Sequence, residues 1–427
     1  MNILIKNGRL VDKATNRDEN LDIVISGDRI EKIEANIDET AYAGYEIIDA
    51  KDCFVMPGFI DLHVHLRDPG FTYKETIETG AKAAAKGGFT TICPMPNTKP
   101  ATDNPEIVAE LVKRAKTESP ITVLPVGAIT IGQAGKELTD IKGMAKAGIC
   151  AISEDGKSVM DSQIYREAMK LAKECNIPVL AHCEDINLVA GGVMNLDEKA
   201  TTLGLKGISN AVEDIIVARD ILLAKETGAA LHLCHCSTED SVRMIHDAKE
   251  QGLPVTGEVC PHHFILSTED IPTNDANYKM NPPLRGVKDV EALKQGLKEG
   301  IMDAISTDHA PHSEEEKARG FEGAPFGIVG LETSATLTYT ELVLKGYLTP
   351  MGMVEKMSYQ PAKILGIDRG TLQEGKIADV VIFNPNSTYC IDKETFVSKG
   401  KNTPFHGKEV KGHVACTIHH GEIVYRY

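Results

Sequence analysis

The sequence predicts an α/β protein in which a (β/α)8 barrel of the TIM type is joined to a small β-sandwich-like domain. Three observations lead to this prediction. Short apolar strands alternate with helical segments through the middle of the 427 residues, which is the pattern of a parallel sheet. About eight such units occur there, the number that closes a barrel. Both ends of the chain are instead rich in short strands separated by turns.

The β-rich ends are each too short to bury a sheet core alone, so we expect them to form one domain together. The expected strands are Asn2–Ile5, Leu21–Ile25, Arg29–Ile33 and Glu46–Asp49 near the start, and Val380–Phe383, Cys416–His419 and Glu422–Tyr425 near the end. We therefore assign residues 1–55 together with 369–427 to the small β-domain, and residues 56–368 to the barrel.

The barrel strands are expected where apolar runs end in polar residues. In chain order they are Phe59–Leu66, Thr90–Met95, Ile121–Ile129, Ile149–Ser153, Val179–His182, Ala230–Cys236, Val255–Val259 and Ala304–Thr307. Helical segments lie between them, and one begins at Asn104-Pro105, a capping residue followed by proline in the first turn. The charged, glycine-containing connection Ser313–Gly327 is expected to close over the substrate as a lid, although a solvated surface loop has the same composition.

The composition excludes several classes of protein. Hydrophobic residues make up 42% and charged residues 25%, the balance of a globular protein. With 62 acidic and 46 basic residues the net charge is −16, which argues against nucleic acid as a partner. The N-terminus does not have the pattern of a signal peptide, and no apolar run reaches the roughly 18 residues of a membrane helix. The ten cysteines contain no CxxC pair, so we expect reduced thiols, a cytoplasmic location and no membrane partner.

Histidines and aspartates cluster where the predicted barrel strands end. With a strand period of two, His63 and His65 point to the same side, toward the barrel axis. The carboxyl ends of all barrel strands open on one face, so residues far apart in the sequence meet there. The candidate ligands at these ends are His63, His65, Asp155, His182, His235 and Asp308. This set predicts a site for Zn²⁺, one or two ions per subunit, with two favoured.

Six motifs identify a family. They are PGFIDLHVHLRDPG (57–70), CPMPNT (93–98), AHCED (181–185), NPPLR (281–285), STDHAPH (306–312) and APFGIVGLET (324–333). With them the chain resembles the amidohydrolase superfamily, and within it the bacterial type I dihydroorotases, over nearly its whole length. The resemblance implies reversible hydrolysis of (S)-dihydroorotate to N-carbamoyl-L-aspartate in de novo pyrimidine (UMP) biosynthesis.

The resemblance also implies a role for each site residue. His63 and His65 would hold the more buried metal, and His182 and His235 the more exposed one. Asp308 would be the catalytic residue as well as a ligand of the first metal, taking a proton from the metal-bridging hydroxide and giving it to the leaving ring nitrogen. The substrate-binding residues implied are His65, Leu66, Arg67, Asn97, Asn281, His312, Phe326 and Gly327.

The residue that bridges the two metals departs from the commonest family pattern. Many relatives use a carboxylated lysine at the end of the fourth strand, whereas this chain has Asp155 there. Lys157, two residues later, is the alternative. Because an aspartate reaches less far than a carboxylated lysine, we expect the second metal to be held less tightly.

Other readings of the same features remain open at this point. Hydantoinase, dihydropyrimidinase and allantoinase share the fold and the histidines, but their substrates lack the ring carboxylate that Arg67 and Asn97 are expected to bind. Arg67 itself could instead pair with Asp68 or Glu75. An inactive scaffold homologue would have lost metal ligands, and all six are present. The resemblance further leads us to expect a homodimer and leaves association with aspartate carbamoyltransferase open.

Overall fold

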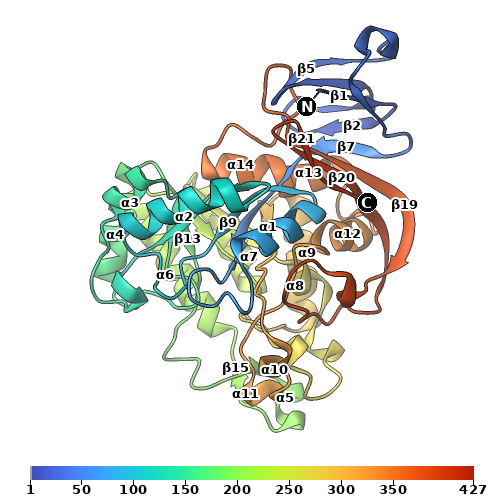
Figure 1. Ribbon diagram of the computed structural model, residues 1–427. Helices are drawn as coiled ribbons and strands as arrows, with labels where there is room; N and C mark the ends of the chain where they lie inside the picture. The colour runs from blue at the N-terminus through green and yellow to red at the C-terminus, as the bar shows by residue number, and fades with distance from the viewer. Residues whose placement is uncertain (1) are drawn as a thin grey trace.

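Parallel strands form a closed barrel at the centre of the structure, a computed structural model that describes residues 2–427 (Figure 1). In order they are β8 (Phe59–Val64), β9 (Phe89–Pro94), β10 (Thr122–Val123) continued by β11 (Val126–Ala128), β12 (Ala151–Ser153), β13 (Val179–Ala181), β16 (Leu231–Leu233), β17 (Val255–Val259) and β18 (Ala304–Ile305). Neighbours in this order pair in parallel within two sheets. The barrel closes where Val64 pairs with His309, and the His65 amide donates to the His309 carbonyl at 2.8 Å.

The predicted barrel fold is confirmed, and most of its strands are shorter than expected. The third predicted strand, 121–129, is divided into β10 and β11 on either side of Leu124 and Pro125. Proline has no N–H to donate to a neighbouring strand, which explains why the ladder is interrupted here.

Helices follow most of the barrel strands and cover the outside of the barrel. They are α1 (Ile77–Lys86), α2 (Pro105–Glu118), α3 (Ile141–Ala147), α4 (Ser162–Glu174), α6 (Ala211–Thr227), α7 (Glu239–Glu250), α8 (Pro261–Ile265), α9 (Val287–Glu299), α12 (Ser334–Thr338), α13 (Pro350–Val354) and α14 (Gln360–Leu365). Helix α2 begins as its sequence predicts, since the Asn104 side chain accepts from the Ile107 amide at 3.0 Å. None of the helices within residues 2–427 has the length and apolar character needed to cross a lipid bilayer.

Strands from both ends of the chain lie together beside the barrel. One sheet has the order β5-β4-β1-β6 and the other β21-β20-β19-β7-β2-β3. The strands are β1 (Asn2–Lys6), β2 (Arg9–Asp12), β3 (Arg17–Asn20), β4 (Asp22–Ser26), β5 (Arg29–Glu34), β6 (Glu46–Asp49), β7 (Phe54–Pro57), β19 (Val380–Cys390), β20 (Glu409–His419) and β21 (Glu422–Arg426). Apolar residues from both ends share one core, among them Ile5, Ile23, Val55, Val380 and Ile418. The limit predicted between residues 55 and 56 falls inside β7, so the domain boundaries stay a prediction.

Short elements gather at the end of the molecule opposite to these sheets (Figure 1). They are β14 (Met194–Asn195), β15 (Gly207–Ile208), α5 (Glu198–Leu203), α10 (Glu314–Lys317) and α11 (Gly320–Gly323). The N- and C-termini both lie at the other end, next to the two sheets (Figure 1).

Candidate metal and substrate site

The six predicted metal ligands converge at the carboxyl ends of the barrel strands, and all of them are buried. His63 lies on β8, and the others follow β8, β12, β13, β16 and β18. The backbone turns sharply at three of the strand ends, because Arg67, His235 and Asp308 have positive φ angles of 58°, 35° and 47°. Residues other than glycine rarely adopt this conformation, and such strained positions cluster at functional sites.

The first group of ligands is formed by His63, His65 and Asp308. His65 Nε2 lies 3.0 Å from Asp308 Oδ1, and His63 Nε2 lies 3.5 Å from the same oxygen. The ligand atoms of a tetrahedral zinc ion lie roughly 3.3 Å apart, given Zn–N distances of about 2.0 Å. The spacing of these three side chains therefore suits one metal ion.

The second group is formed by His182 and His235, with Asp155 between the two groups. His182 Nδ1 lies 2.9 Å from His235 Nε2. Asp155 Oδ1 lies 3.1 Å from His63 Nε2, 3.5 Å from His182 Nδ1 and 3.8 Å from His235 Nε2. Asp155 thus reaches both groups, whereas the Lys157 ammonium points elsewhere and donates to the Gln133 carbonyl at 2.9 Å.

Side chains behind the ligands determine which ring nitrogen faces the site. His65 Nδ1 lies 2.9 Å from Asn97 Oδ1, which can only accept, so His65 carries its proton on Nδ1 and Nε2 is free. His182 Nε2 lies 3.1 Å from the Glu184 carboxylate, which likewise leaves Nδ1 free. The free nitrogens are those that face Asp308 and Asp155.

The electrostatics of the cluster favour added positive charge. Burial opposes the charged form of these side chains, but Asp155 outweighs it and raises the pKa of His63 well above its ordinary value. The pKa of His182 is raised to about 10, against burial, by Asp155 and Glu184. The pKa of the Asp155 carboxyl and that of Asp308 are both lowered by the imidazoles around them, although burial alone would raise them.

A divalent cation would supply the positive charge that this cluster favours. Among the described residues, His63 Nε2, the nitrogen that faces Asp155 and Asp308, has no hydrogen-bond partner of good geometry. Buried polar groups without partners are rare in proteins unless an ion or water meets them. Imidazole and carboxylate donors at this spacing are those that Zn²⁺ prefers. The residues present therefore fit a metal centre.

A cavity of about 300 Å³ lies over this cluster. Its lining includes His65, Arg67, Asn97, Asn281, His312, Phe326 and Gly327, so seven of the eight predicted substrate-binding residues face it. Leu66 does not: its side chain is 3% exposed and packs in the apolar core. The structure brings the seven together, and their contacts with a substrate stay a prediction.

Arg67 has no carboxylate partner among residues 2–427. Its Nε donates to the Pro311 carbonyl at 3.2 Å. The two carboxylates that could have paired with it are engaged elsewhere, since Asp68 binds Arg114 at 2.8 Å and Glu75 lies 3.2 Å from His309. The guanidinium therefore faces the cavity without a carboxylate in direct contact, although Asp308, Asp155 and Glu316 attract it from farther away. An anionic group of a ligand is its natural partner.

His312 is held next to Arg67 as a neutral ring. Its Nδ1 lies 3.1 Å from the Lys74 ammonium, which can only donate, and its Nε2 donates to the Phe326 carbonyl at 2.8 Å. Burial, Arg67 and Lys74 all lower the pKa of His312. Because the single N–H of this ring is used on the Phe326 carbonyl, Arg67 Nη2, 3.2 Å from His312 Nε2, is the donor left for a ligand.

The two asparagines predicted to read the substrate are already engaged within the protein. Asn97 Nδ2 donates to Asp155 Oδ2 at 2.9 Å, and Asn281 Nδ2 donates to Glu184 Oε1 at 2.9 Å. Both therefore link the cavity wall to the candidate ligand cluster and its supporting side chains. Asn97 is thus less free than Arg67 to bind a carboxylate.

Sequence reasoning missed three charged residues that support the site. Glu258 on β17 is fully buried, and its Oε1 lies 3.5 Å from His63 Nδ1. Glu184 orients His182, and Lys74 orients His312. The glutamate inside the apolar strand Val255–Val259 was a usable signal, because a lone buried carboxylate needs a partner. Lys74 lies in a polar stretch of sequence without such a signal.

The sequence is similar to that of known proteins over its whole length. A family model described as "Dihydro-orotase-like" matches residues 53–241. A relative named dihydroorotase from Pelotomaculum thermopropionicum is 47% identical over 424 residues, covering 99% of this chain and 98% of its own. Another dihydroorotase, from Geobacter metallireducens, is 47% identical over 426 residues and covers 100% of both chains.

Solved structures share the fold at lower identity. The L-hydantoinase (dihydropyrimidinase) of Arthrobacter aurescens has a TM-score of 0.89 at 29% identity, covering 99% of this chain and 96% of its own. The dihydropyrimidinase of Brevibacillus agri has a TM-score of 0.87 at 27% identity, covering 100% of this chain and 95% of its own.

Proposed function

Because the chain belongs to the dihydroorotase family of the amidohydrolase superfamily, we propose that it hydrolyses the ring amide of (S)-dihydroorotate to N-carbamoyl-L-aspartate, reversibly, in pyrimidine biosynthesis. The observation that carries this proposal is Arg67, a cation that faces the cavity without a carboxylate partner in residues 2–427. The ring carboxylate of dihydroorotate supplies that partner, and the planar guanidinium matches it with two parallel hydrogen bonds. Hydantoins and dihydrouracil have no such group.

The metal ligands divide into two sets in this proposal. His63, His65 and Asp308 would hold one Zn²⁺, His182 and His235 a second, and Asp155 would contact both. When bound, such ions lower the pKa of water toward neutrality and polarise the carbonyl that is attacked. Two ions are favoured because Asp155 Oδ1 lies within 3.8 Å of nitrogens from both sets.

The protein's own residues orient the substrate and move the proton. Arg67 binds the ring carboxylate, and the neutral His312 beside it uses its one N–H to hold the Phe326 carbonyl at the edge of the cavity. Asp308 is kept ionised by His65 and the other imidazoles, so it can accept the proton of the attacking water. As the new C–O bond forms and the ring C–N bond breaks, Asp308 returns that proton to the departing nitrogen, which becomes the carbamoyl amide.

Substrate preference tests the proposal directly. Turnover of dihydroorotate would be measured beside hydantoin, dihydrouracil and allantoin, with the bound metal counted on the same sample. We expect hydrolysis of dihydroorotate and the reverse cyclisation of N-carbamoyl-L-aspartate. Faster hydrolysis of hydantoin or dihydrouracil would instead assign the activity named for the solved neighbours, and a protein with no turnover and no metal would be an inactive homologue.

Removal of Asp155 should cost metal, and removal of Lys157 should not. We expect Asp155→Ala to lose at least one ion, because its Oδ1 lies 3.5 Å from His182 Nδ1 and 3.8 Å from His235 Nε2. Lys157→Ala should keep both ions, since its ammonium binds Gln133 instead. The measurement is metal content by atomic emission.

Reconstitution provides the control for this prediction. Apo-enzyme restored with Zn²⁺ in CO₂-free buffer should regain full activity, because an aspartate needs no carboxylation. A requirement for bicarbonate, or a Lys157→Ala protein without metal, would show that the lysine is the bridging residue.

A homodimer is supported by the outward face of α6. Ala211, Ile215, Ala218 and Leu222 form an apolar stripe there, with Ile215 49% and Leu222 66% exposed. A two-fold axis pairs such a stripe with itself and covers it. We expect Leu222→Glu to halve the molecular mass measured by light scattering, while a wild-type monomer would contradict the proposal. Association with aspartate carbamoyltransferase stays a prediction that co-purification of the two proteins would test.

A further inference from the structure

Two buried lysines hold the segment Ser313–Gly327 against the cavity. Lys279 and Lys317 are 3% and 7% exposed. Neither has a carboxylate within 4 Å among residues 2–427, the range in which an ion pair counts. Burial and the neighbouring Lys279 lower the pKa of Lys317 to about 7. Burying an ammonium without an ion partner is unfavourable, so what it binds is informative.

The Lys317 ammonium binds backbone carbonyls. It donates to the carbonyls of Pro325 at 3.1 Å, Gly327 at 2.9 Å and Lys279 at 3.1 Å. These contacts use all three of its N–H bonds. The carbonyl between the two on the loop, that of Phe326, accepts from His312 Nε2. Three successive peptide groups of the cavity lining are thus fixed by two side chains.

Further contacts attach the loop that contains these peptides to the rest of the protein. Lys279 Nζ donates to the carbonyls of Phe321 and Ala324 and lies 4.5 Å from the centroid of the Phe326 ring. Asn402 Nδ2 donates to the Gly327 carbonyl at 3.0 Å, and its Oδ1 accepts from the His312 amide at 3.0 Å. Lys279 and Asn402, which lie outside the loop, thereby attach it to two other segments of the chain.

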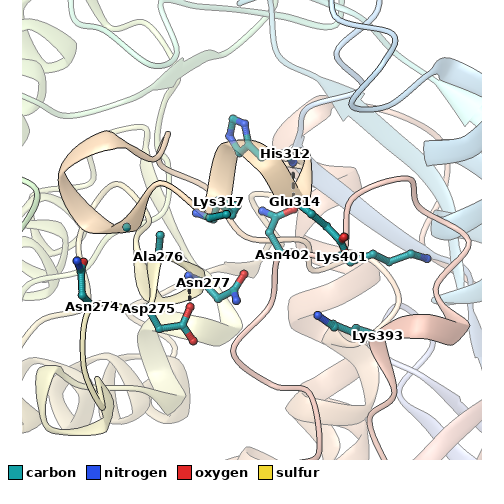
Figure 2. Close-up of a pocket in the computed structure, with 12 residues that line it drawn as sticks. Asn274, Asp275, Ala276, Asn277, His312, Glu314, Lys317, Lys393, Lys401 and Asn402 are labelled. Atoms are coloured by element: carbon teal, nitrogen blue, oxygen red, sulfur yellow. Dashed lines mark hydrogen bonds between the residues drawn. The ribbon is translucent and has the colours of Figure 1, made fainter.

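Lys317 also separates two cavities. Figure 2 shows it with His312 and Asn402 at the edge of a neighbouring pocket of about 400 Å³. His312 lines both that pocket and the active-site cavity, and Phe326 and Gly327 line only the latter. The peptides that Lys317 binds therefore form a wall of the cavity that contains Arg67. The Lys317 side chain, which holds them in place, lines the neighbouring pocket instead.

We propose that Lys317 is a positioning residue for substrate binding, because it fixes Pro325–Gly327 as the wall against which the substrate packs. The identity of that substrate rests on the proposed function. The contacts described favour a fixed wall over the mobile lid expected from the composition of residues 313–327. Lys317 contacts neither the metal ligands nor Arg67, so its role is confined to the wall.

Replacement of Lys317 by methionine keeps the length of the side chain and removes its three donors. For Lys317→Met we expect KM for dihydroorotate to rise about 10- to 100-fold, since displacing a binding wall by about 1 Å has effects of this size. We expect kcat to change less than about threefold and the metal content not at all, because a uniform loss of binding affects KM alone. Hydrogen–deuterium exchange should become faster in the peptide containing residues 324–329.

Lys393→Met is the matched control. Lys393 lines the neighbouring pocket (Figure 2), but its ammonium approaches Glu394 at 3.9 Å rather than the wall. This variant should keep the wild-type KM and exchange rates. Lys279→Met, which frees the Phe321 and Ala324 carbonyls, provides a second test if Lys317→Met does not fold, and it too should raise KM.

An unchanged KM in a folded Lys317→Met or Lys279→Met protein would overturn the proposal, even if exchange became faster, because the lysine would then only stabilise the loop. If the wild type itself fails to hydrolyse dihydroorotate, the proposed function fails. Hydrogen–deuterium exchange alone then tests whether Lys317 fixes Pro325–Gly327. Faster exchange confined to residues 324–329 in Lys317→Met then supports it, and unchanged exchange overturns it.

Discussion

Asp308→Asn should lower kcat/KM for dihydroorotate by about 10² to 10⁴, the range for loss of a general base. The amide keeps the shape of the side chain but cannot accept the proton of the attacking water. In the structure Asp308 Oδ1 lies 3.0 Å from His65 Nε2, and the surrounding imidazoles keep the pKa of its carboxyl low. Steady-state kinetics in both directions would measure the loss.

Metal content separates the two reasons for such a loss. Asp308 is also a candidate ligand, so the variant must be assayed with its metal counted and, where needed, restored with Zn²⁺. A rate that stays low at full metal content identifies the proton-transfer role. A variant with near-normal activity would remove Asp308 from the mechanism altogether.

Arg67→Met should cost on the order of 2 to 5 kcal/mol in transition-state binding of dihydroorotate, the range for removing the partner of a buried charge. The metal content should be unchanged, because Arg67 contacts His312 and Pro311 rather than the ligand cluster. The loss should fall mainly on substrates with a ring carboxylate, so a comparison of dihydroorotate with dihydrouracil measures it.

Arg114→Met is the matched control for this prediction. Arg114 binds Asp68 at 2.8 Å, and Asp68 is the residue that follows Arg67 in the sequence. Neither Arg114 nor Asp68 lines the cavity. Its loss should leave kcat/KM near the wild-type value. An Arg67→Met enzyme with unchanged kcat/KM would show that the substrate carboxylate binds elsewhere.

The convergence of the six candidate ligands was predictable because residues at the ends of different barrel strands meet in space. His63 and Asp308 are far apart along the chain, but His63 lies near the end of β8 and Asp308 follows β18, and such strand ends meet on one face. The alternation along β8 also placed His63 and His65 on the same side. Strand limits were less predictable, since Pro125 interrupts a run whose hydrophobicity is continuous.

The supporting contacts could not be read from the sequence, because their partners are backbone atoms or distant side chains. Lys317 occupies a charged stretch typical of a solvated loop, yet its ammonium is buried against carbonyls. Lys74 and Glu258 each act on a histidine that only the folded barrel brings near. No local pattern indicates such long-range pairs.

The pairing of β7 with β19 has a consequence for how the enzyme is made. Phe54 and Pro57 of β7 pair with Phe383 and Val380 of β19, and β7 leads directly into the strand that carries His63. A ribosome adding about 5 to 20 residues per second reaches β19 tens of seconds after β7. Throughout that interval β7 has only one of its two neighbours, β2, which is synthesised before it. We therefore expect metal binding to follow synthesis of β19, and the free edge of β7 to need protection in the nascent chain until then.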